Sequence, residues 1–267
     1  MSLLKDYIGD KEYYKKLLTV AVPLALTMLL QSCMSIVDTI MVSSIGMVTA
    51  VGNAGNIIQL KDGISWGITS GISIFAAQFF GADQKENMAR TFGFCLVLMF
   101  LNSFLWVGAV YLAGERILFF YLNDPEVVKY SLIYIRIAIL ALIPDAFCFS
   151  CSIMFRSKHN TKLPFVLSIV ATVCNICFNY FFIYVLKIGV AGAAYGTLIA
   201  SSVLAFIYLF ILFKDKPDFF IPSKMFDIHL GFIKPVFKTM GPLIVNETFF
   251  SSVFTEYTGT CFDVADV

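Results

Sequence analysis

Charged side chains are scarce in this sequence. Asp, Glu, Lys and Arg make up 14% of its 267 residues, whereas soluble domains carry about 25%. Hydrophobic residues make up 59%, and the mean hydropathy is +0.83. This deficit of charge excludes an ordinary soluble domain and indicates a membrane protein, whose surroundings are the lipid bilayer. The net charge of +1 gives no sign of a nucleic-acid partner, and none is expected.

The sequence also lacks the motifs of common enzymes. It has no H-E-x-x-H, G-x-S-x-G or P-loop motif, and its only histidines, His159 and His229, fall in polar segments. Two C-x-x-C pairs begin at Cys148 and Cys174, but both lie within apolar segments, where cysteine acts as a small hydrophobic residue. We therefore expect no enzyme, no cofactor and no zinc site.

Long apolar runs are what the sequence does have. The first runs from Leu17 to Val42 and exceeds the roughly 20 residues that an α-helix needs to cross a bilayer. Comparable runs follow at 51–80, 92–112, 131–155, 163–186 and 190–213, with a weaker one from 233 to about 253. The alternating pattern of a membrane barrel is absent, so the backbone must be helical. The predicted fold is an all-α membrane protein: a six-transmembrane-helix lobe plus a partial seventh helix.

The positive charges predict an orientation. If the N-terminus is cytoplasmic, only Arg116, Lys129 and Lys187 fall in outer loops, and most other Lys and Arg residues fall inside. The positive-inside rule then predicts a multi-pass protein of the cell membrane (inner or plasma) with a cytoplasmic N-terminus. Lys61 and Arg136 lie within predicted helices, near the outer surface, and we expect both side chains to snorkel to the interface.

The polar stretch Lys214–Asp227 divides the chain, because Pro217 and Pro222 block a continuous helix. We predict a six-helix lobe over residues 1–214, a cytoplasmic inter-lobe linker over 215–232, and the start of a second lobe over 233–267. The segment that begins at Lys234 resembles the one that begins at Lys15. Internal repeats of this kind underlie many transporters, whose substrate sites lie between the halves.

Asp38 lies inside the first apolar run, where an ionised carboxylate costs about 2.5–3.5 kcal/mol on insertion scales. Such groups usually face a bundle interior and serve ions, protons or substrate. Counting the helical rise from the predicted membrane boundaries places Asp38, Asn179 and Thr197 roughly 10 Å below the outer edge. Asn175 lies one turn from Asn179 on the same helical face. These four side chains are expected to meet.

Two interpretations of this group remain open. One carboxylate with amide and hydroxyl oxygens suits a hard monovalent cation such as Na⁺, and a carboxylate in a low dielectric can instead carry a proton. Alternatively, Asn175, Asn179 and Thr197 merely cross-link helices through hydrogen bonds worth about 0.6 kcal/mol each. The second interpretation leaves the carboxylate unexplained.

Two further acids lie at membrane depth. Asp145 follows Pro144, which should free a backbone carbonyl and kink its helix, so Asp145 is a candidate for a cavity wall. Glu247 lies in the weaker seventh run and is a candidate for the lobe interface. For both, contact with substrate competes with structural pairing inside the bundle.

Several dispersed segments occur together in an order that resembles one family. These are VPLALTMLLQSCMSIVDTIMV, GISIFAAQFFGADQKEN, FRSKHNTKLP, NICFNYFFIYVLKIGVAGAAYGT and PLIVNE. Together they are similar to the multidrug and toxic compound extrusion (MATE) transporters. The resemblance implies a cation-coupled antiporter with two six-helix lobes, which exports small organic cations and amphipathic drugs in exchange for Na⁺ or H⁺.

Carried over by position, the resemblance implies a cation-coupling site at Asp38, Asn175, Asn179 and Thr197. Some relatives have Asp where this chain has Asn179, which leaves the choice of Na⁺ or H⁺ open. Glu247 matches an acidic residue of the family's second lobe, whereas Asp145 matches no family role. Because the family has about twelve helices, we expect this chain to be the N-terminal part of a truncated transporter that lacks the second lobe.

Two other functions stay open. A flippase for lipid-linked sugars has a related helical plan, but such proteins usually line the central cavity with arginines, and this sequence places no Arg at mid-membrane depth. The other is a truncated remnant that does not transport, or a half-length protein that acts only as a dimer.

Overall fold

The computed structural model describes residues 10–121 and 124–265, and within them it is built of helices. The helices are α1 (Lys11–Ser43), α2 (Val48–Gly81), α3 (Lys85–Tyr121), α4 (Pro125–Ala138), α5 (Leu142–Ser157), α6 (Lys162–Tyr180), α7 (Val190–Asp215), α8 (Pro222–Met225) and α9 (Leu230–Ala265). A 3₁₀ turn, η2 (Ile139–Ala141), joins α4 to α5, and a π-helical turn, η3 (Phe181–Val185), ends α6. The predicted all-α fold is confirmed.

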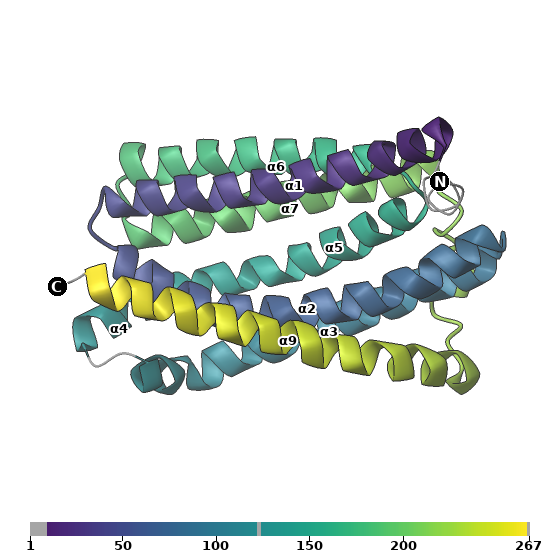
Figure 1. The fold of residues 1–267 in the computed structure, drawn as a ribbon. Helices are drawn as coiled ribbons and strands as arrows, with labels where there is room; N and C mark the ends of the chain where they lie inside the picture. The colour runs from purple at the N-terminus through teal and green to yellow at the C-terminus, as the bar shows by residue number, and fades with distance from the viewer. Residues whose placement is uncertain (1–9, 122–123, 266–267) are drawn as a thin grey trace, which may run out of the picture.

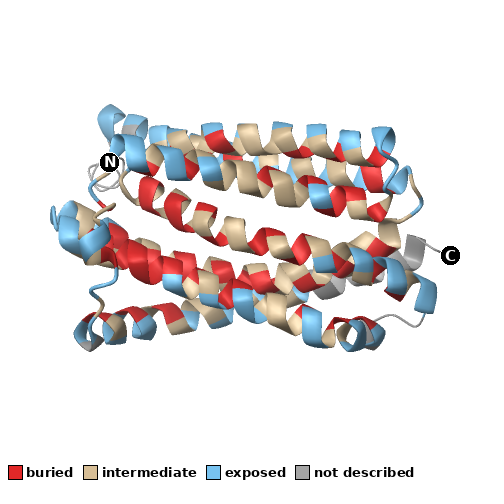
Figure 2. Ribbon diagram, turned by 180° about the vertical axis from the view of Figure 1, so that it is seen from behind, coloured by how far each residue is buried: buried red, intermediate tan, exposed pale blue. Residues whose placement is uncertain are grey.

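The long helices run roughly along one common axis, with consecutive spans in opposite directions, and form two layers (Figure 1). One layer holds α1, α6 and α7, and the other holds α2, α3 and α9, with α5 in contact with α2, α3 and α7. All the links predicted to be cytoplasmic lie at one end of the bundle, together with the start of α1. Buried residues gather on the middle and lower helices, whereas the upper layer is mostly intermediate or exposed (Figure 2).

Five helical segments of the described residues are long and apolar enough to cross a membrane. They are Lys11–Ser43, Lys85–Phe119, Pro125–Ser157, Lys162–Val185 and Val190–Asp215. The predicted second span forms α2 but is not among them, because α2 carries many glycine and polar residues and also contains Lys61 and Asp62. Many residues of α2 are buried by its neighbours, so its composition is set by helix packing more than by lipid.

Three glycines let α9 pack closely against α2. Gly63, Gly67 and Gly71 lie four residues apart, and a Cβ atom on any of them would collide with α9. The colliding atoms belong to Ser251, Ile244 and Met240 respectively. Small residues allow helix backbones to approach, which is how transmembrane helices associate. The glycine face of α2 is therefore the surface on which α9 packs.

The polar segment between α7 and α9 is attached to the rest of the bundle. Phe219 is fully buried, and its ring packs edge-on against Phe92 and Phe155 with ring centroids 5.2 Å apart in each case. Asp218 forms ion pairs with Lys158 at 2.7 Å and Lys85 at 3.2 Å. This segment lies within the predicted linker 215–232, and the predicted domain bounds stay a prediction.

Pro23 of α1 and Pro144 of α5 each lack a backbone N–H donor, as do Pro235 and Pro242 inside α9. Pro144 lies just after η2, where the backbone changes to a 3₁₀ turn between α4 and α5. In α1, Pro23 has no N–H to bond the carbonyl of Thr19. That carbonyl accepts a hydrogen bond from the Thr161 hydroxyl at 3.5 Å instead, so the break in α1 is bridged by the start of α6.

Candidate functional site

Asp38 lies on the face of α1 that meets α6. One oxygen of its carboxylate, Oδ1, accepts a hydrogen bond of 2.7 Å from the Asn179 side-chain amide. Asp38 is partly buried, and Asn179 is only 1% exposed. No Lys, Arg or His in the described residues forms an ion pair with Asp38 at 4.0 Å or less. The carboxylate is therefore held by a neutral partner.

The other predicted side chains extend this contact into a hydrogen-bonded series. The Asn179 amide also donates to Asn175 Oδ1 at 3.2 Å, and the Asn175 amide donates to Thr197 Oγ1 at 3.3 Å. The Thr197 hydroxyl in turn donates to the Ala193 carbonyl at 3.1 Å. The structure thus brings together Asp38, Asn175, Asn179 and Thr197, from three helices of one layer.

Asn179 has an oxygen that no donor reaches. Its Oδ1 atom is buried, and the described residues give it no hydrogen-bond partner. A buried amide oxygen without a partner costs free energy, so such an atom needs an explanation. Gly196 of α7 faces it so closely that a Cβ at that position would overlap the oxygen. The site therefore combines a carboxylate with an amide oxygen that has no partner among the described residues, and oxygen atoms of these kinds are the ligands that hard cations prefer.

Two more hydrogen bonds join α1 to the helix of Asn175 and Asn179. Near the C-terminal end of α1, the hydroxyls of Ser44 and Tyr184 lie 2.8 Å apart, and Tyr184 belongs to the π-helical turn η3. At the other end, the bond from Thr161 to the Thr19 carbonyl bridges the break at Pro23. The Asp38 contact lies between these two, so a change at Asp38 acts on a helix that is tied at both ends.

Sequence reasoning missed Tyr134 of α4. Its phenol lies close enough to Asp38 for an electrostatic interaction, and its ring packs on the cluster of Met41, Val42, Ile183 and Ala193. Tyr134 occurs in an apolar run rich in other aromatic residues, so no feature of the sequence distinguishes it. Only its position in the fold brings it next to the carboxylate.

Asp145 belongs to a different group. Its carboxylate lies beside the Ser201 hydroxyl of α7 and interacts electrostatically with Lys61 and Asp62 of α2. Lys61 itself is only 2% exposed, and its ammonium donates to Asp62 Oδ1 at 2.6 Å. The expectation that Lys61 snorkels was therefore wrong, because a nearby carboxylate holds the ammonium inside the bundle. Arg136, by contrast, is exposed.

Glu247 lies on α9, where the helix packs against the glycines of α2. Its backbone carbonyl would lie 3.0 Å from a Cβ atom at Gly63, and its side chain is partly exposed. Glu247 is thus at the contact of α9 with α2 and apart from the four residues around Asp38. Its assignment as a substrate or cavity residue stays a prediction.

Comparison with curated proteins gives consistent relatives. The chain is 28% identical over 204 residues to multidrug and toxin extrusion protein 2 of Mus musculus, a match that covers 74% of this chain and 35% of the relative. It is 30% identical over 204 residues to multidrug and toxin extrusion protein 1 of Xenopus tropicalis, which covers 74% of this chain and 34% of that protein. The chain spans about a third of the length of these curated relatives.

Solved structures share the fold. A crystal structure of a MATE protein in the bent conformation superposes with a TM-score of 0.80 at 22% identity, over 86% of this chain and 52% of that one. Within the sequence itself, residues 23–181 match the MatE family model, a segment that includes Asp38, Asn175 and Asn179. The chain is a multi-pass membrane protein, and it belongs to the MatE family of transporters.

Proposed function

We propose that this chain supplies the N-terminal lobe of a multidrug efflux antiporter that exports small organic cations and amphipathic drugs in exchange for Na⁺ or H⁺. The observation that carries the proposal is the half-buried Asp38 carboxylate, which is bonded to an amide and has no cationic partner among the described residues. A carboxylate at membrane depth without a counter-charge is a place for a mobile cation.

The names of the relatives support the transport part of this proposal. The curated relatives are multidrug and toxin extrusion proteins, and one structural neighbour is a multidrug resistance MATE family transporter. Membership in a transporter family agrees with the prediction that the chain is not an enzyme. What those proteins export is a property of those proteins, and its transfer to this chain is our proposal.

Each residue of the group has a distinct part in the proposed coupling. Asp38 supplies the negative charge, and Asn179 supplies both a donor to Asp38 and the oxygen without a partner. Asn175 and Thr197 hold Asn179 in place through their hydrogen bonds. A Na⁺ ion would use the carboxylate and amide oxygens, whereas a proton would bind the Asp38 carboxylate itself. In either case the arriving charge competes with the hydrogen bond from Asn179.

The break at Pro23 gives α1 a place to respond. The Thr19 carbonyl has lost its helical donor and depends on Thr161, so less free energy is needed to bend α1 there than in an unbroken helix. We propose that cation binding at Asp38 shifts the population of straight and bent α1 and thereby opens or closes the substrate cavity. We further propose a location in the inner or plasma membrane with the N-terminus in the cytoplasm.

A chimera tests this function directly. Residues 1–214 of this chain replace the matching segment of a curated relative, and export of a fluorescent organic cation from proteoliposomes is measured under an imposed Na⁺ gradient or an imposed pH gradient. We expect export in one or both gradients, and its loss in the Asp38→Asn chimera. The gradient that drives export identifies the coupling ion.

The matched control is the same substitution in the other carboxylate group, Asp145→Asn. The amount of each chimera in the membrane is measured, so that loss of export is separated from failure to insert. Export that continues in the Asp38→Asn chimera in both gradients would contradict the proposed role of Asp38. Export that stops equally in both variants would leave no special role for Asp38.

A further inference from the structure

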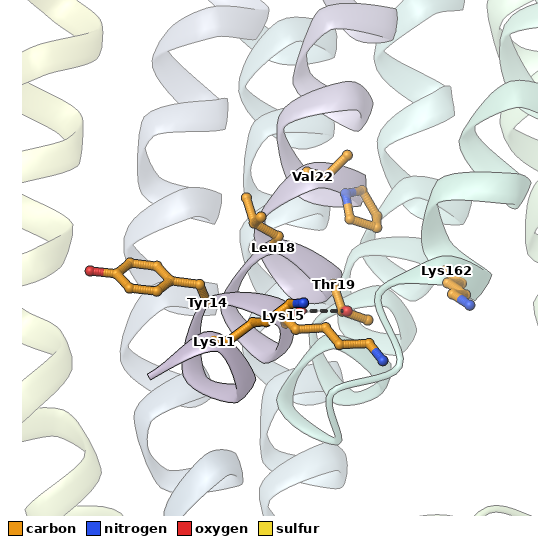
Figure 3. Close-up of a pocket in the computed structure, with 8 residues that line it drawn as sticks. Lys11, Tyr14, Lys15, Leu18, Thr19, Val22 and Lys162 are labelled. Carbon is orange, nitrogen blue, oxygen red and sulfur yellow. Dashed lines mark hydrogen bonds between the residues drawn. The ribbon is translucent and has the colours of Figure 1, made fainter. Parts of the chain in front are cut away.

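A cavity lies between the N-terminal ends of α1 and α6, at the end of the bundle where the links predicted to be cytoplasmic gather. Its volume is about 640 Å³, and eight residues line it. Figure 3 shows the lysines of α1 and Lys162 of α6 at the same end of this cavity, with Leu18 and Val22 further along α1. The cavity lies on the same two helices as Asp38 and Asn179 but close to the other end of α1.

One end of the cavity is strongly basic. Lys11 and Lys15 lie four residues apart and therefore on the same face of α1. Lys162 is the first residue of α6, so the positive end of that helix points to the same place. None of the eight lining residues, all within the described part of the chain, is acidic. Three ammonium groups and a helix N-terminus together attract an anion.

The rest of the cavity is apolar. Leu18, Val22 and Pro23 line it further along α1, and the side chains of Leu18 and Val22 are 57% and 46% exposed. These residues belong to the apolar helix Lys11–Ser43, in whose most hydrophobic window only 6% of the residues are buried by protein. Tyr14 lines the basic end, and tyrosine is enriched at the level of lipid headgroups.

We propose that this cavity binds one anionic phospholipid, with its phosphate among Lys11, Lys15 and Lys162 and an acyl chain along Leu18 and Val22. The order of groups along α1 matches the order of groups along a phospholipid, from charged headgroup to hydrocarbon. Basic pockets between transmembrane helices bind anionic lipid headgroups in this manner. A soluble phosphate would use the lysines but would leave the apolar wall without an occupant.

The position of the cavity means that a bound lipid would affect the packing of α1 against α6. Thr19 and Pro23 also line it, so a bound lipid lies against the break in the hydrogen bonding of α1. The hydrogen bond from Thr161 to the Thr19 carbonyl joins α1 to α6 at the same place. A lipid that contacts both helices stabilises their contact, because a ligand that binds the folded state stabilises that state.

The test is native mass spectrometry of the purified 267-residue chain in neutral detergent, titrated with phosphatidylglycerol or with phosphatidylcholine of the same acyl chains. We expect tighter binding of phosphatidylglycerol by the wild-type chain. Lys11→Gln with Lys15→Gln should weaken phosphatidylglycerol binding by at least about tenfold, since each lysine near an anionic lipid contributes about a fivefold change. Lys162→Gln alone should weaken it by about fivefold.

The matched control is Lys234→Gln with Lys238→Gln, because these lysines have the same spacing near the start of α9, are exposed, and do not line the cavity. Inorganic phosphate and glycerol 3-phosphate serve as competitors that carry the same charge without acyl chains. Thermal unfolding of each variant shows that it is folded. The control pair should bind phosphatidylglycerol as the wild type does, and the competitors should have little effect.

Three results would overturn the proposal. Unchanged phosphatidylglycerol affinity in both the Lys11/Lys15 and the Lys162 variants would remove the site. An equal loss in the Lys234/Lys238 control would show attraction to a diffuse basic surface. Displacement of the lipid by glycerol 3-phosphate at matched concentration would show a site for a soluble anion. A second variant, Val22→Trp, fills the apolar end and should weaken lipid binding while leaving any phosphate binding unchanged.

Discussion

Two carboxylates of the bundle, Asp38 and Asp145, have surroundings of opposite electrostatic character. Around Asp38, one carboxylate is bonded to the neutral amide of Asn179. Around Asp145, the counter-charge is a side chain of the protein itself. The Lys61 ammonium donates a hydrogen bond to Asp62 and interacts electrostatically with the Asp145 carboxylate. Both groups use helices that pack against α7.

This difference supports our proposal that the group around Asp38 is the one that binds an external ion. A carboxylate with an internal ammonium is already neutralised, and breaking such a pair is costly. A carboxylate with only amide and hydroxyl neighbours keeps its negative charge available, and the Asn179 oxygen that lacks a partner adds a second ligand. The comparison therefore favours Asp38 over Asp145 as the place where a mobile cation binds.

The largest effect on stability is expected from removing the internal cation. Lys61→Gln should destabilise the purified chain by about 2 kcal/mol, less than the 3–5 kcal/mol of a fully buried pair, because the Asp62 side chain is partly exposed. Chemical or thermal unfolding in detergent measures this loss. The double variant with Asp62→Asn should recover part of it. A single variant as stable as the wild type would mean that Lys61 does not neutralise its neighbours.

An intermediate effect is expected from filling the space beside Asn179. Gly196→Ala places a methyl group on the Asn179 oxygen, which should cost about 1–2 kcal/mol after the gain in helix propensity is included. Unfolding measurements give this value. The matched control is Gly108→Ala in α3, which has open space around its Cβ and should be neutral or stabilising. Equal results for the two glycines would contradict the close contact at Asn179.

A smaller effect is expected from Asp38→Asn. This substitution removes the charge but leaves an oxygen to accept the hydrogen bond from Asn179, so the change in stability should be below about 1 kcal/mol. The same unfolding assay compares it with Lys61→Gln. If Asp38→Asn destabilised the chain more than Lys61→Gln does, Asp38 would be a structural residue and the contrast between the two groups would fail.

The smallest expected effect is a pH-dependent change in local stability at two exposed carboxylates, Asp218 and Asp227. They serve as a reference for Asp38 and Asp145. Hydrogen bonds from Lys158 and Lys85 lower the pKa of Asp218, and a hydrogen bond from Arg90 lowers the pKa of Asp227. A lowered pKa in the folded state means that the stabilisation is present above the ordinary Asp value of about 3.9 and is lost as the pH falls through the folded value.

Hydrogen exchange of the segment between α7 and α9 should therefore increase as the pH falls below about 4, after correction for intrinsic exchange rates. Asp218→Asn should already show faster exchange near neutral pH, because its ion pairs with Lys85 and Lys158 are absent. Protection that is the same in this variant and in the wild type would show that Phe219 alone holds the segment.

Much of this arrangement follows from local rules in the sequence. The apolar runs predict the long helices, and i, i+4 spacing predicts that Asn175 and Asn179 share a face. Helical rise then brings Asp38 and Thr197 to the same depth. Local rules of this kind can be applied to a sequence because an α-helix has a fixed geometry over its whole length.

Contacts between distant helices could not be predicted in the same way. The burial of Lys61 depends on Asp62 and on the packing of α2 against α5, which carries Asp145, and hydropathy does not encode that packing. The approach of Tyr134 to Asp38 depends on how α4 lies against α1 and α7. The π-helical turn after Asn179 changes the register of the backbone, but its sequence contains no proline or glycine from which the turn could be predicted.

Infrared difference spectroscopy of the purified chain tests the central claim most directly, because it detects the carboxylate that responds when Na⁺ is added or the pH is lowered. We predict one responding carboxylate in the wild type, the same signal in Asp145→Asn, and its loss in Asp38→Asn. A signal that persists in Asp38→Asn and disappears in Asp145→Asn would place the mobile cation beside Lys61 and contradict the account.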